Sequence, residues 1–458
     1  MTEPGRKRAR ASRTDDVLRR PKRWMAAFLL VVGAACVAIQ AASLVRGSSP
    51  ALIVSDGKQY YAWARSVVLD GDLDFRNDYA LLYPPDPLPP EAEQVTPKGL
   101  VVNKYPVGMA VLETPGLLLG HAAARLLPGG PADGVSTPYQ VAVSSTLTAF
   151  VLLGAYALFL AALRLGAAPF AAGSLTAAML VSTNLWHYVA KEPAMPHGAG
   201  VALGGIALFL MSGWEGPWES VSRRQLLAVG ACVGLLFLVR NSNVFLAPAL
   251  GALAFRARPL SLRPVLFAGA PAVALAALQP VAFSLLQGGL RLVPYPDEGF
   301  AGGIGNVVRT LDSSRHGLLV YHPLYALLLA VCLAGLFRPA ARRTAAGALA
   351  SFGLLLVVNG TWWCWWFGDS FGNRAFIEAL PPLVLASAVA LSPRAPRRPG
   401  GPLLAAALVL ATLLNASLWT GYVLKRFPQD GRHSVRAAWL WFLPGVAREP
   451  GEARGAGR

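Results

Sequence analysis

The sequence predicts an all-α integral membrane protein with about eleven transmembrane helices and a long first loop on the outer side of the membrane. Of its 458 residues, 54% are hydrophobic and only 14% are charged, whereas a soluble domain carries about 25% charge. The mean hydropathy is +0.46, and the apolar residues gather in charge-poor runs of membrane-spanning length. This composition excludes a disordered chain. Four cysteines without metal-ligand spacing also exclude a disulfide scaffold.

The first predicted helix covers residues 25–44 and contains no charged residue. At 1.5 Å of rise per residue, a run of this length spans the hydrocarbon core. It follows a tail, residues 1–24, that holds nine of the 41 Lys and Arg. We interpret the run as an uncleaved helix with a cytoplasmic N-terminus, because it is long and lacks a clean signal-peptide cleavage site.

Ten further apolar runs complete the predicted transmembrane domain, residues 25–424. They lie at 139–163, 170–190, 198–213, 225–240, 243–256, 264–286, 319–337, 343–361, 375–392 and 401–424. The first outer loop, residues 47–138, is expected to contain helices that lie on the membrane surface. The C-terminal tail, residues 425–458, is rich in Gly, Arg and Glu and is expected to be loosely ordered.

The basic residues fix the predicted orientation. Twelve Lys and Arg fall in five short connections, and all five lie on the cytoplasmic side if residues 107–127 do not cross the membrane. We therefore interpret 107–127 as a re-entrant or membrane-surface helix on the outer side. The formal net charge of +17 follows this pattern. No basic stripe carries interleaved aromatic residues, so we expect the bilayer, and not nucleic acid, as the partner.

Polar residues collect in the outer loops. Residues 47–106 hold eight of the 24 acidic residues, whereas the inner connections are short and plain. Any chemistry is therefore expected on the outer face. Asp56 follows the first helix and opens a run of aromatic residues at helical spacing. One interpretation is an N-cap of a membrane-surface helix. The other is a carboxylate that accepts the proton of an acceptor hydroxyl.

Four later outer segments offer further candidates. Lys191, Glu192 and His197 lie at a helix end, where ionisable residues are costly and often functional, although snorkelling or a Lys–Glu ion pair also explains them. Arg315 and His316 precede a helix, a position that suits a phosphate. The other outer candidates are Arg240 at another helix end and Trp365, Asp369 and Arg374 in the segment 362–374, whose four tryptophans are typical of an interfacial belt.

These features together resemble the GT-C membrane glycosyltransferases, which include protein O-mannosyltransferases, aminoarabinose transferases and the oligosaccharyltransferase catalytic subunit. The resemblance rests on the first helix, the Asp56 loop with its following Tyr-Tyr, K-Y-P-V-G at 104–108, Lys191-Glu192-Pro193, and W-W-F-G-D-S-F-G-N-R at 365–374. It covers roughly residues 25–392. Family members often carry two adjacent acids in the first loop, whereas here Gly57 follows Asp56.

The resemblance implies a bacterial plasma-membrane enzyme that moves a sugar from a polyprenyl-phosphate donor to a hydroxyl of a glycan, lipid or protein, by inverting displacement on the outer face. Asp56 and Glu192 are the candidate catalytic acids. Lys191, Arg240, Arg315 and Arg374 are the candidate phosphate contacts, and Tyr60, Tyr61, His197, His316, Trp365 and Asp369 are the candidate substrate-lining residues. No cofactor is expected, and the absence of a second acid next to Asp56 does not support a divalent metal.

Two other classes of function stay open at this point. A transporter or flippase of lipid-linked glycans is expected to place ionisable residues in the middle of its helices, whereas here they cluster at helix ends. A polysaccharide polymerase or ligase is expected to place its Arg and His residues in one large late loop, which the early Asp56 loop does not favour.

Overall fold

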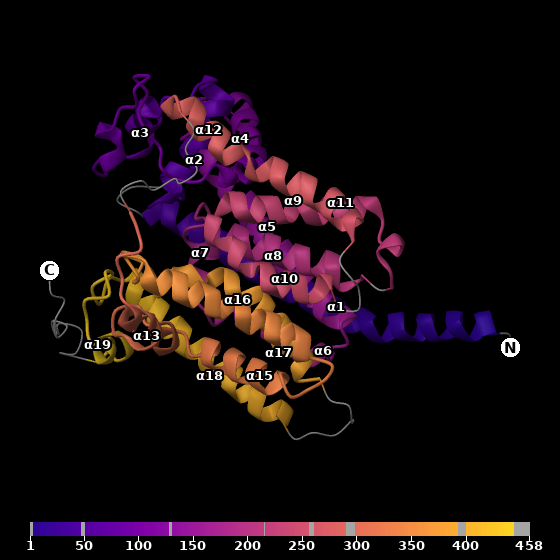
Figure 1. The fold of residues 1–458 in the computed structure, drawn as a ribbon. Coiled ribbons are helices and arrows are strands. Elements are labelled where there is room, and N and C mark those ends of the chain that lie inside the picture. Colours follow the sequence, from indigo (N-terminus) through magenta and orange to yellow (C-terminus); the bar gives the residue numbers. More distant parts are fainter. Residues whose placement is uncertain are drawn as a thin grey trace.

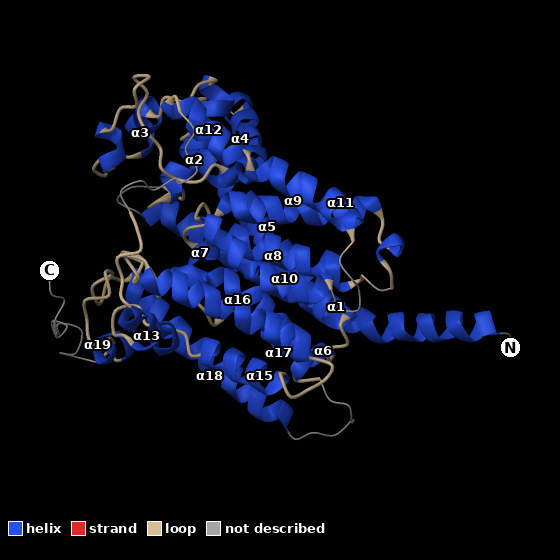
Figure 2. Ribbon diagram, viewed as in Figure 1, coloured by secondary structure: helices blue, strands red, loops and turns tan. Residues whose placement is uncertain are grey.

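The computed structural model describes residues 3–46, 51–127, 131–214, 216–255, 261–289, 298–392 and 400–443, and these residues form helices without any strand (Figure 2). The N-terminal half consists of α1 (Glu3–Arg46), α2 (Gly57–Arg65), η1 (Ser66–Asp70), α3 (Arg76–Leu82), η2 (Pro90–Glu93), α4 (Gly108–Leu126), α5 (Thr137–Arg164), α6 (Pro169–Val181), α7 (Leu185–Ala190), α8 (Pro196–Ser212), η3 (Trp218–Ser220) and α9 (Arg223–Val239). The rest consists of η4 (Asn241–Leu246), α10 (Ala247–Ala254), α11 (Leu262–Ala276), α12 (Leu278–Gln287), α13 (Ile304–Asp312), α14 (Leu318–Tyr321), α15 (Leu324–Gly335), α16 (Arg342–Thr361), η5 (Arg374–Ala379), α17 (Leu380–Ala390), α18 (Gly400–Val423) and α19 (Val435–Trp439).

The long helices run side by side as a bundle (Figure 1). Five segments are long and apolar enough to cross a membrane: Arg19–Val45, Thr137–Arg164, Leu262–Gln287, Arg342–Thr361 and Gly401–Val423. Three shorter apolar helices, α6, α8 and α15, lie among them. The predicted all-helical membrane architecture is therefore confirmed, while the number of eleven crossings stays a prediction.

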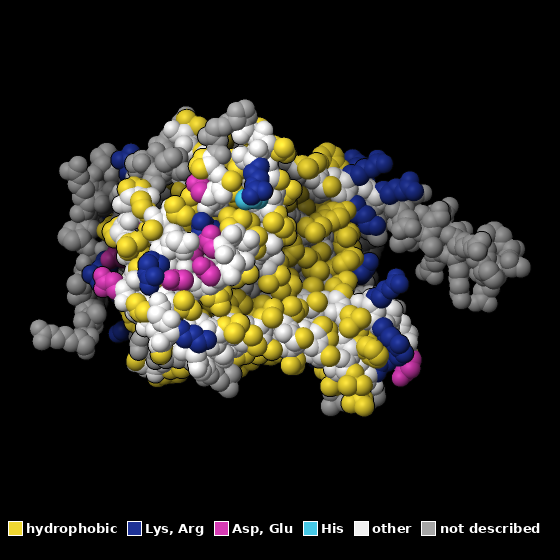
Figure 3. Space-filling model, turned by 90° about the horizontal axis from the view of Figure 1, so that it is seen from above, with side chains coloured by type: hydrophobic (Ala, Val, Ile, Leu, Met, Phe, Trp, Pro, Cys, Tyr) yellow, Lys and Arg dark blue, Asp and Glu magenta, His cyan; other side chains and the backbone are white. Residues whose placement is uncertain are grey.

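Charged side chains separate toward the two ends of the bundle. Figure 3 shows an apolar band in the middle, Lys and Arg at the end from which α1 projects, and a mixture of acidic and basic side chains at the opposite end. This distribution agrees with the cytoplasmic N-terminus that the sequence predicts. The helix α19 lies at the end opposite to the start of α1 (Figure 1).

Polar residues interrupt one predicted span. Residues 170–190 form two helices, α6 and α7, because the side chains between them bond away from their own helix. The Asn184 side-chain amide donates to the Asn373 carbonyl oxygen at 3.0 Å, and the Ser182 hydroxyl lies 2.7 Å from that of Thr412. This break ties α7 to the segment that carries η5.

Glycines let the helices approach closely, as is usual in membrane bundles. A Cβ on Gly116 of α4 would lie 2.7 Å from the Val143 Cα of α5, and one on Gly120 would lie 2.6 Å from the Tyr139 Cα. On α9, a Cβ on Gly230 would lie 2.1 Å from a backbone oxygen of α11. These contacts hold the first outer loop and α11 against the bundle.

The first outer loop is fixed by a buried arginine. Arg65 in α2 forms ion pairs with Asp70 at 2.5 Å and Asp78 at 2.8 Å, and its Nε donates to the Asp133 carbonyl oxygen at 2.8 Å. Three parts of the loop therefore meet at one guanidinium. These contacts hold α2 in position, and they therefore also position Asp56 at the start of that helix.

The C-terminal tail is only partly described. Residues 425–443 include α19, and the Trp441 indole donates to the Ser417 carbonyl oxygen of α18 at 2.9 Å. This part of the tail is folded onto the bundle. The sequence predicts that the whole tail, residues 425–458, is loosely ordered. Its remaining part, residues 444–458, lies outside the described residues.

The orientation of α4 can be tested by cysteine labelling. In a variant without the four native cysteines, we expect Ala132→Cys to react with a membrane-impermeant maleimide from outside, and Arg164→Cys only after the membrane is opened. Both residues are exposed. Ala132 lies just before the start of α5, and Arg164 is its last residue. If Ala132→Cys reacts only from the cytoplasm, then α4 crosses the membrane and the predicted topology is wrong.

Candidate active site

A cavity of about 520 Å³ lies where the outer-loop segments meet the ends of several helices. Its walls come from the start of α2, the segment before α4, the start of α8, the end of α9 with η4, the segment before α13, the end of α16 and the start of η5. Its lining residues are Asp56, Tyr60, Lys104, Tyr105, Pro106, Met195, Pro196, His197, Phe237, Arg240, Asn241, Ser242, Val244, Phe245, Glu298, Phe300, Val358, Asn359, Trp362, Phe367 and Arg374. Segments far apart in sequence therefore build one site.

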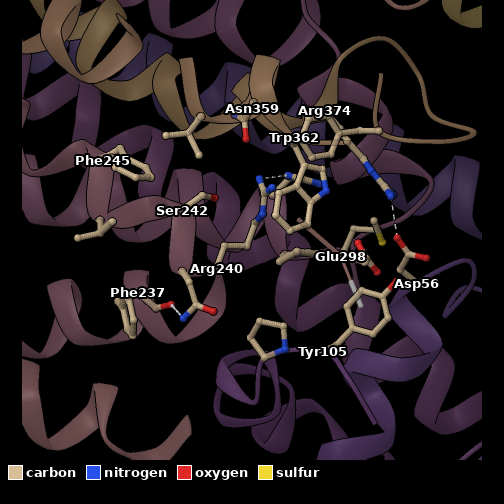
Figure 4. Close-up of a pocket in the computed structure, with 18 of the residues that line it drawn as sticks. Asp56, Tyr105, Phe237, Arg240, Ser242, Phe245, Glu298, Asn359, Trp362 and Arg374 are labelled. Carbon is tan, nitrogen blue, oxygen red and sulfur yellow. Dashed lines mark hydrogen bonds and ion pairs between the residues drawn. The ribbon is translucent and has the colours of Figure 1, made fainter. Parts of the chain in front are cut away.

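Asp56 and Arg374 form an ion pair in the wall of this cavity. The Arg374 Nη2 lies 2.7 Å from the Asp56 Oδ2, and the two side chains are 18% and 31% exposed. Asp56 occupies the N-cap position of α2, but its side chain accepts no hydrogen bond from the helix amides. The capping interpretation therefore does not describe this carboxylate, which is directed at Arg374 (Figure 4).

The charge of Arg374 is stabilised by its surroundings. Burial opposes that charge, but the nearby Asp56 carboxylate outweighs it and raises the pKa of the Arg374 guanidinium above its ordinary value. A guanidinium has five N–H donors, so the contact with Asp56 does not use all that it can donate. Arg374 can therefore bind a second anion while it holds Asp56.

A second charged group lies on the neighbouring wall. Arg240, which follows α9, has its Nη1 3.1 Å from both carboxylate oxygens of Glu378 in η5. The His197 Nδ1 at the start of α8 lies 3.1 Å from the Glu378 Oε1. Glu378 is buried, whereas Arg240 and His197 line the cavity. The carboxylate thus holds the arginine and the histidine in fixed positions.

Lys104 provides a third cation. Its Nζ lies 2.9 Å from the Glu91 Oε1 and 3.1 Å from the Glu298 Oε1. Burial opposes its charge, but the two carboxylates outweigh this and raise the pKa of Lys104 above its ordinary value. The Trp363 indole donates to the Glu298 Oε2 at 3.0 Å. Glu298, which precedes α13, therefore joins the segment before α4 to the segment after α16.

The cavity has one polar and one apolar side. In Figure 4, Asp56, Glu298 and Tyr105 lie on one side and Phe237 and Phe245 on the other. Val244, Val358 and Phe300 extend the apolar lining. The arrangement suits an amphiphile, with its charged group near the cations and its hydrocarbon against the aromatic and branched side chains.

The structure brings together part of the predicted set. Asp56, Tyr60, His197, Arg240 and Arg374 line the cavity. Glu192 and Lys191 do not. The Glu192 carboxylate instead accepts a hydrogen bond from the Ser55 hydroxyl at 3.2 Å, and the Lys191 ammonium donates to the Ser43 hydroxyl of α1 at 2.7 Å.

Five other predicted residues lie away from the cavity. Arg315 stacks on Trp366 with its guanidinium carbon 3.6 Å from the ring centre, and its Nε donates to the Asp430 carbonyl oxygen. His316 contacts the Trp366 and Gln429 carbonyl oxygens. Tyr61 is buried and donates to the Gly134 carbonyl oxygen at 2.6 Å. The last two are Trp365, which is buried, and Asp369, which is exposed on the loop before η5.

No family model matches the sequence, and no curated protein matches it. Among solved structures, ArnT from Cupriavidus metallidurans bound to undecaprenyl phosphate is similar, with 17% identity, a TM-score of 0.51, and coverage of 91% of this chain and 69% of that chain. The chain shares the fold of this ArnT structure, as the resemblance of its sequence to the GT-C membrane glycosyltransferases predicts. The archaeal oligosaccharyltransferase AglB from Archaeoglobus fulgidus, in complex with an inhibitory peptide and a dolichol-phosphate, gives 14% identity, a TM-score of 0.46, and coverage of 93% and 61%.

Three residues of the site are not among those predicted from the sequence. Glu378 lies inside the predicted apolar span 375–392, where a lone acid is itself a signal of function. Lys104 is part of the K-Y-P-V-G motif but is not among the predicted site residues, and Glu298 lies between the predicted spans 264–286 and 319–337, where only Arg315 and His316 are predicted. Among the described residues, no group of three or more His, Cys, Asp or Glu side chains is arranged to hold a metal ion.

A glycine of α8 is required for the Glu378 contact. A Cβ on Gly200 would lie 2.6 Å from the Glu378 Cγ, whereas one on Gly204, a turn further along α8, would lie 3.6 Å from its nearest neighbour, an atom of Pro381. We expect Gly200→Ala to cost about 1–3 kcal/mol of stability through overpacking. Gly204→Ala serves as the matched control and should melt like the parent. Thermal unfolding in detergent measures both, and equal melting temperatures for the two variants would contradict the close packing.

Proposed function

We propose that this protein is a membrane glycosyltransferase that moves a sugar from a polyprenyl-phosphate donor to an acceptor hydroxyl on the outer face of a bacterial plasma membrane. One observation carries the proposal: a single cavity holds the Asp56 carboxylate, three cations, of which Lys104 pairs with a second carboxylate, Glu298, and an apolar wall. A lipid phosphate needs the cations and the wall, and glycosyl transfer to a hydroxyl needs the carboxylate. The ArnT structure with undecaprenyl phosphate supports this choice of donor class.

Asp56 is the proposed general base. An acceptor hydroxyl in the cavity transfers its proton to the Asp56 carboxylate while its oxygen forms a bond to the anomeric carbon of the sugar. The bond between that carbon and the phosphate oxygen breaks, and the polyprenyl phosphate leaves with the electron pair. Because attack and departure occur on opposite faces of the carbon, the anomeric configuration inverts.

The cations stabilise the leaving group. Negative charge grows on the phosphate oxygen as the bond breaks, and donors already in position stabilise that charge without reorganisation. Arg374 is fixed by Asp56, Arg240 by Glu378, and Lys104 by Glu298. Two of these cations are guanidiniums, which bind phosphate oxygens in a bidentate manner.

The apolar wall is the proposed seat of the first isoprene units. Phe237, Val244 and Phe245 come from α9 and η4, and Val358 comes from α16. These side chains belong to or adjoin helices of the bundle, so a lipid tail can pass from the bilayer into the cavity beside them. The mixed charges at this end of the molecule support an outer-face site (Figure 3).

The experiment is a donor survey with the purified protein in lipid nanodiscs. Undecaprenyl phosphate should raise the melting temperature, since a ligand at 100 times its Kd stabilises a protein by about 2.7 kcal/mol. A panel of undecaprenyl-phosphate hexoses and pentoses is then incubated with the protein and a membrane glycan extract, and released undecaprenyl phosphate is measured. Binding without any release would favour a transporter, and absence of binding would contradict the donor class.

A further inference from the structure

The residue before Asp56 has an unusual backbone conformation. Ser55 has a φ of +52°, in the left-handed region that non-glycine residues rarely adopt. A residue other than glycine populates this region about fivefold to thirtyfold less than the ordinary backbone regions. A residue keeps such a conformation only where its surroundings hold it there. The Ser55 carbonyl oxygen accepts from the Lys58 amide at 3.2 Å, so this conformation also begins the turn that leads into α2.

Glu192 holds the Ser55 side chain. The Ser55 hydroxyl donates to the Glu192 Oε1 at 3.2 Å, across 137 residues of sequence. Glu192 lies between α7 and α8 and is not among the residues that line the cavity. Its carboxylate is therefore placed to act on the backbone next to Asp56 and not on a substrate.

The carboxylate of Glu192 is itself oriented by His187, which in turn contacts Trp419. The Trp419 indole of α18 donates to the His187 Nδ1 at 3.2 Å, so the neutral ring carries its proton on Nε2. That Nε2 lies 3.3 Å from the Glu192 Oε1 and donates to it. Burial opposes ionisation of Glu192, but the hydrogen bonds from His187 and Ser55 and the charge of the more distant Arg374 outweigh it and lower the pKa of the carboxyl below its ordinary value.

A second contact fixes the other side of Asp56. A Cβ on Gly57 would lie 3.1 Å from the Ala194 Cβ and 3.4 Å from the Ala194 carbonyl carbon. The backbone at 55–57 therefore packs directly on the segment that carries Glu192.

We propose that Glu192 is a positioning residue, which acts through the Ser55 hydroxyl to hold the left-handed turn that sets the Asp56 carboxylate against Arg374. The inference deepens the proposed function and rests on it. It assigns Glu192 a role different from the catalytic one that the sequence suggests. Glycine adopts positive φ without a penalty, so the role has a specific test.

The first experiment measures sugar transfer with the donor that the survey identifies. Glu192→Ala and Ser55→Ala should each lower kcat by about fivefold to thirtyfold with little change in KM, reflecting the cost of the left-handed conformation. Glu192→Gln should keep most activity, because its amide oxygen still accepts from Ser55. Ser55→Gly combined with Glu192→Ala should recover the parent rate to within about threefold, because glycine needs no partner to keep the turn. Activity as low in Glu192→Gln as in Asp56→Asn, or no rescue by glycine, would overturn the proposal.

The second experiment needs no substrate. In a variant without native cysteines, Asp56→Cys and Arg374→Cys are joined by a bifunctional methanethiosulfonate reagent, and the rate of cross-linking is measured. Added Glu192→Ala should slow it about fivefold, and added Ser55→Gly should restore it. An unchanged rate with Glu192→Ala contradicts the positioning role. Slowing and rescue in this assay, together with no consumption of any donor by the parent protein, would reject the glycosyltransferase function and support the positioning role.

Discussion

Asp56→Asn is expected to lower the rate of sugar transfer by about 10²–10⁴, the usual contribution of a general base. The amide keeps the size of the side chain and an oxygen that can accept from the Arg374 Nη2, but it cannot take up the acceptor proton. Because the Asp56 side chain does not cap α2, the helix should keep its start. Turnover is therefore expected to fall far more than the melting temperature does.

Two controls separate this result from a loss of structure. Asp86→Asn makes the same substitution in another outer-loop ion pair, with Lys58 at 2.6 Å, outside the cavity, and should leave turnover unchanged. Binding of undecaprenyl phosphate to Asp56→Asn should be at least as tight as to the parent, because a negative charge next to the proposed phosphate site is gone. Turnover within a few-fold of the parent would show that Asp56 is not the base.

The sequence predicts that the candidate residues share one site better than it predicts which of them line that site. Charged residues at helix ends on one face indicate an outer site, and Asp56, Arg240 and Arg374 do converge there. Arg315 has the same charge and the same face. It is directed elsewhere because Trp366 and the Asp430 carbonyl oxygen hold it. Which outer cations share a cavity depends on contacts between distant segments, and hydropathy and charge carry no information about them.

The membrane-spanning runs illustrate a second limit. Hydropathy predicts the long helices α5 and α16 within a few residues, since an uninterrupted apolar run has one stable form in a bilayer. It does not predict the break at 182–184, because the buried Ser and Asn there bond to α18 and to the loop before η5. Glu378 likewise falls inside a predicted apolar span. Its role depends on Arg240 and His197, which come from two other elements, and hydropathy does not reveal these partners.

Arg374→Lys is expected to weaken binding of undecaprenyl phosphate by about tenfold to more than a hundredfold, since a charge-assisted hydrogen bond contributes about 1.5–3 kcal/mol. Arg374 holds Asp56 and the proposed phosphate at once, and only a planar guanidinium offers donors in two fixed directions. An ammonium can pair with one of the two, and the nearby Asp56 competes with the phosphate for it.

Arg76→Lys, in an exposed ion pair with Asp74, is the matched control and should bind undecaprenyl phosphate like the parent. The double variant Asp56→Asn with Arg374→Lys should bind more tightly than Arg374→Lys alone, because the ammonium then has no competing carboxylate. Titration of the parent and the three variants with undecaprenyl phosphate in nanodiscs, monitored by tryptophan fluorescence, measures the four affinities. Unchanged affinity in Arg374→Lys would remove the guanidinium from the phosphate site and leave Arg240 and Lys104 as its cations.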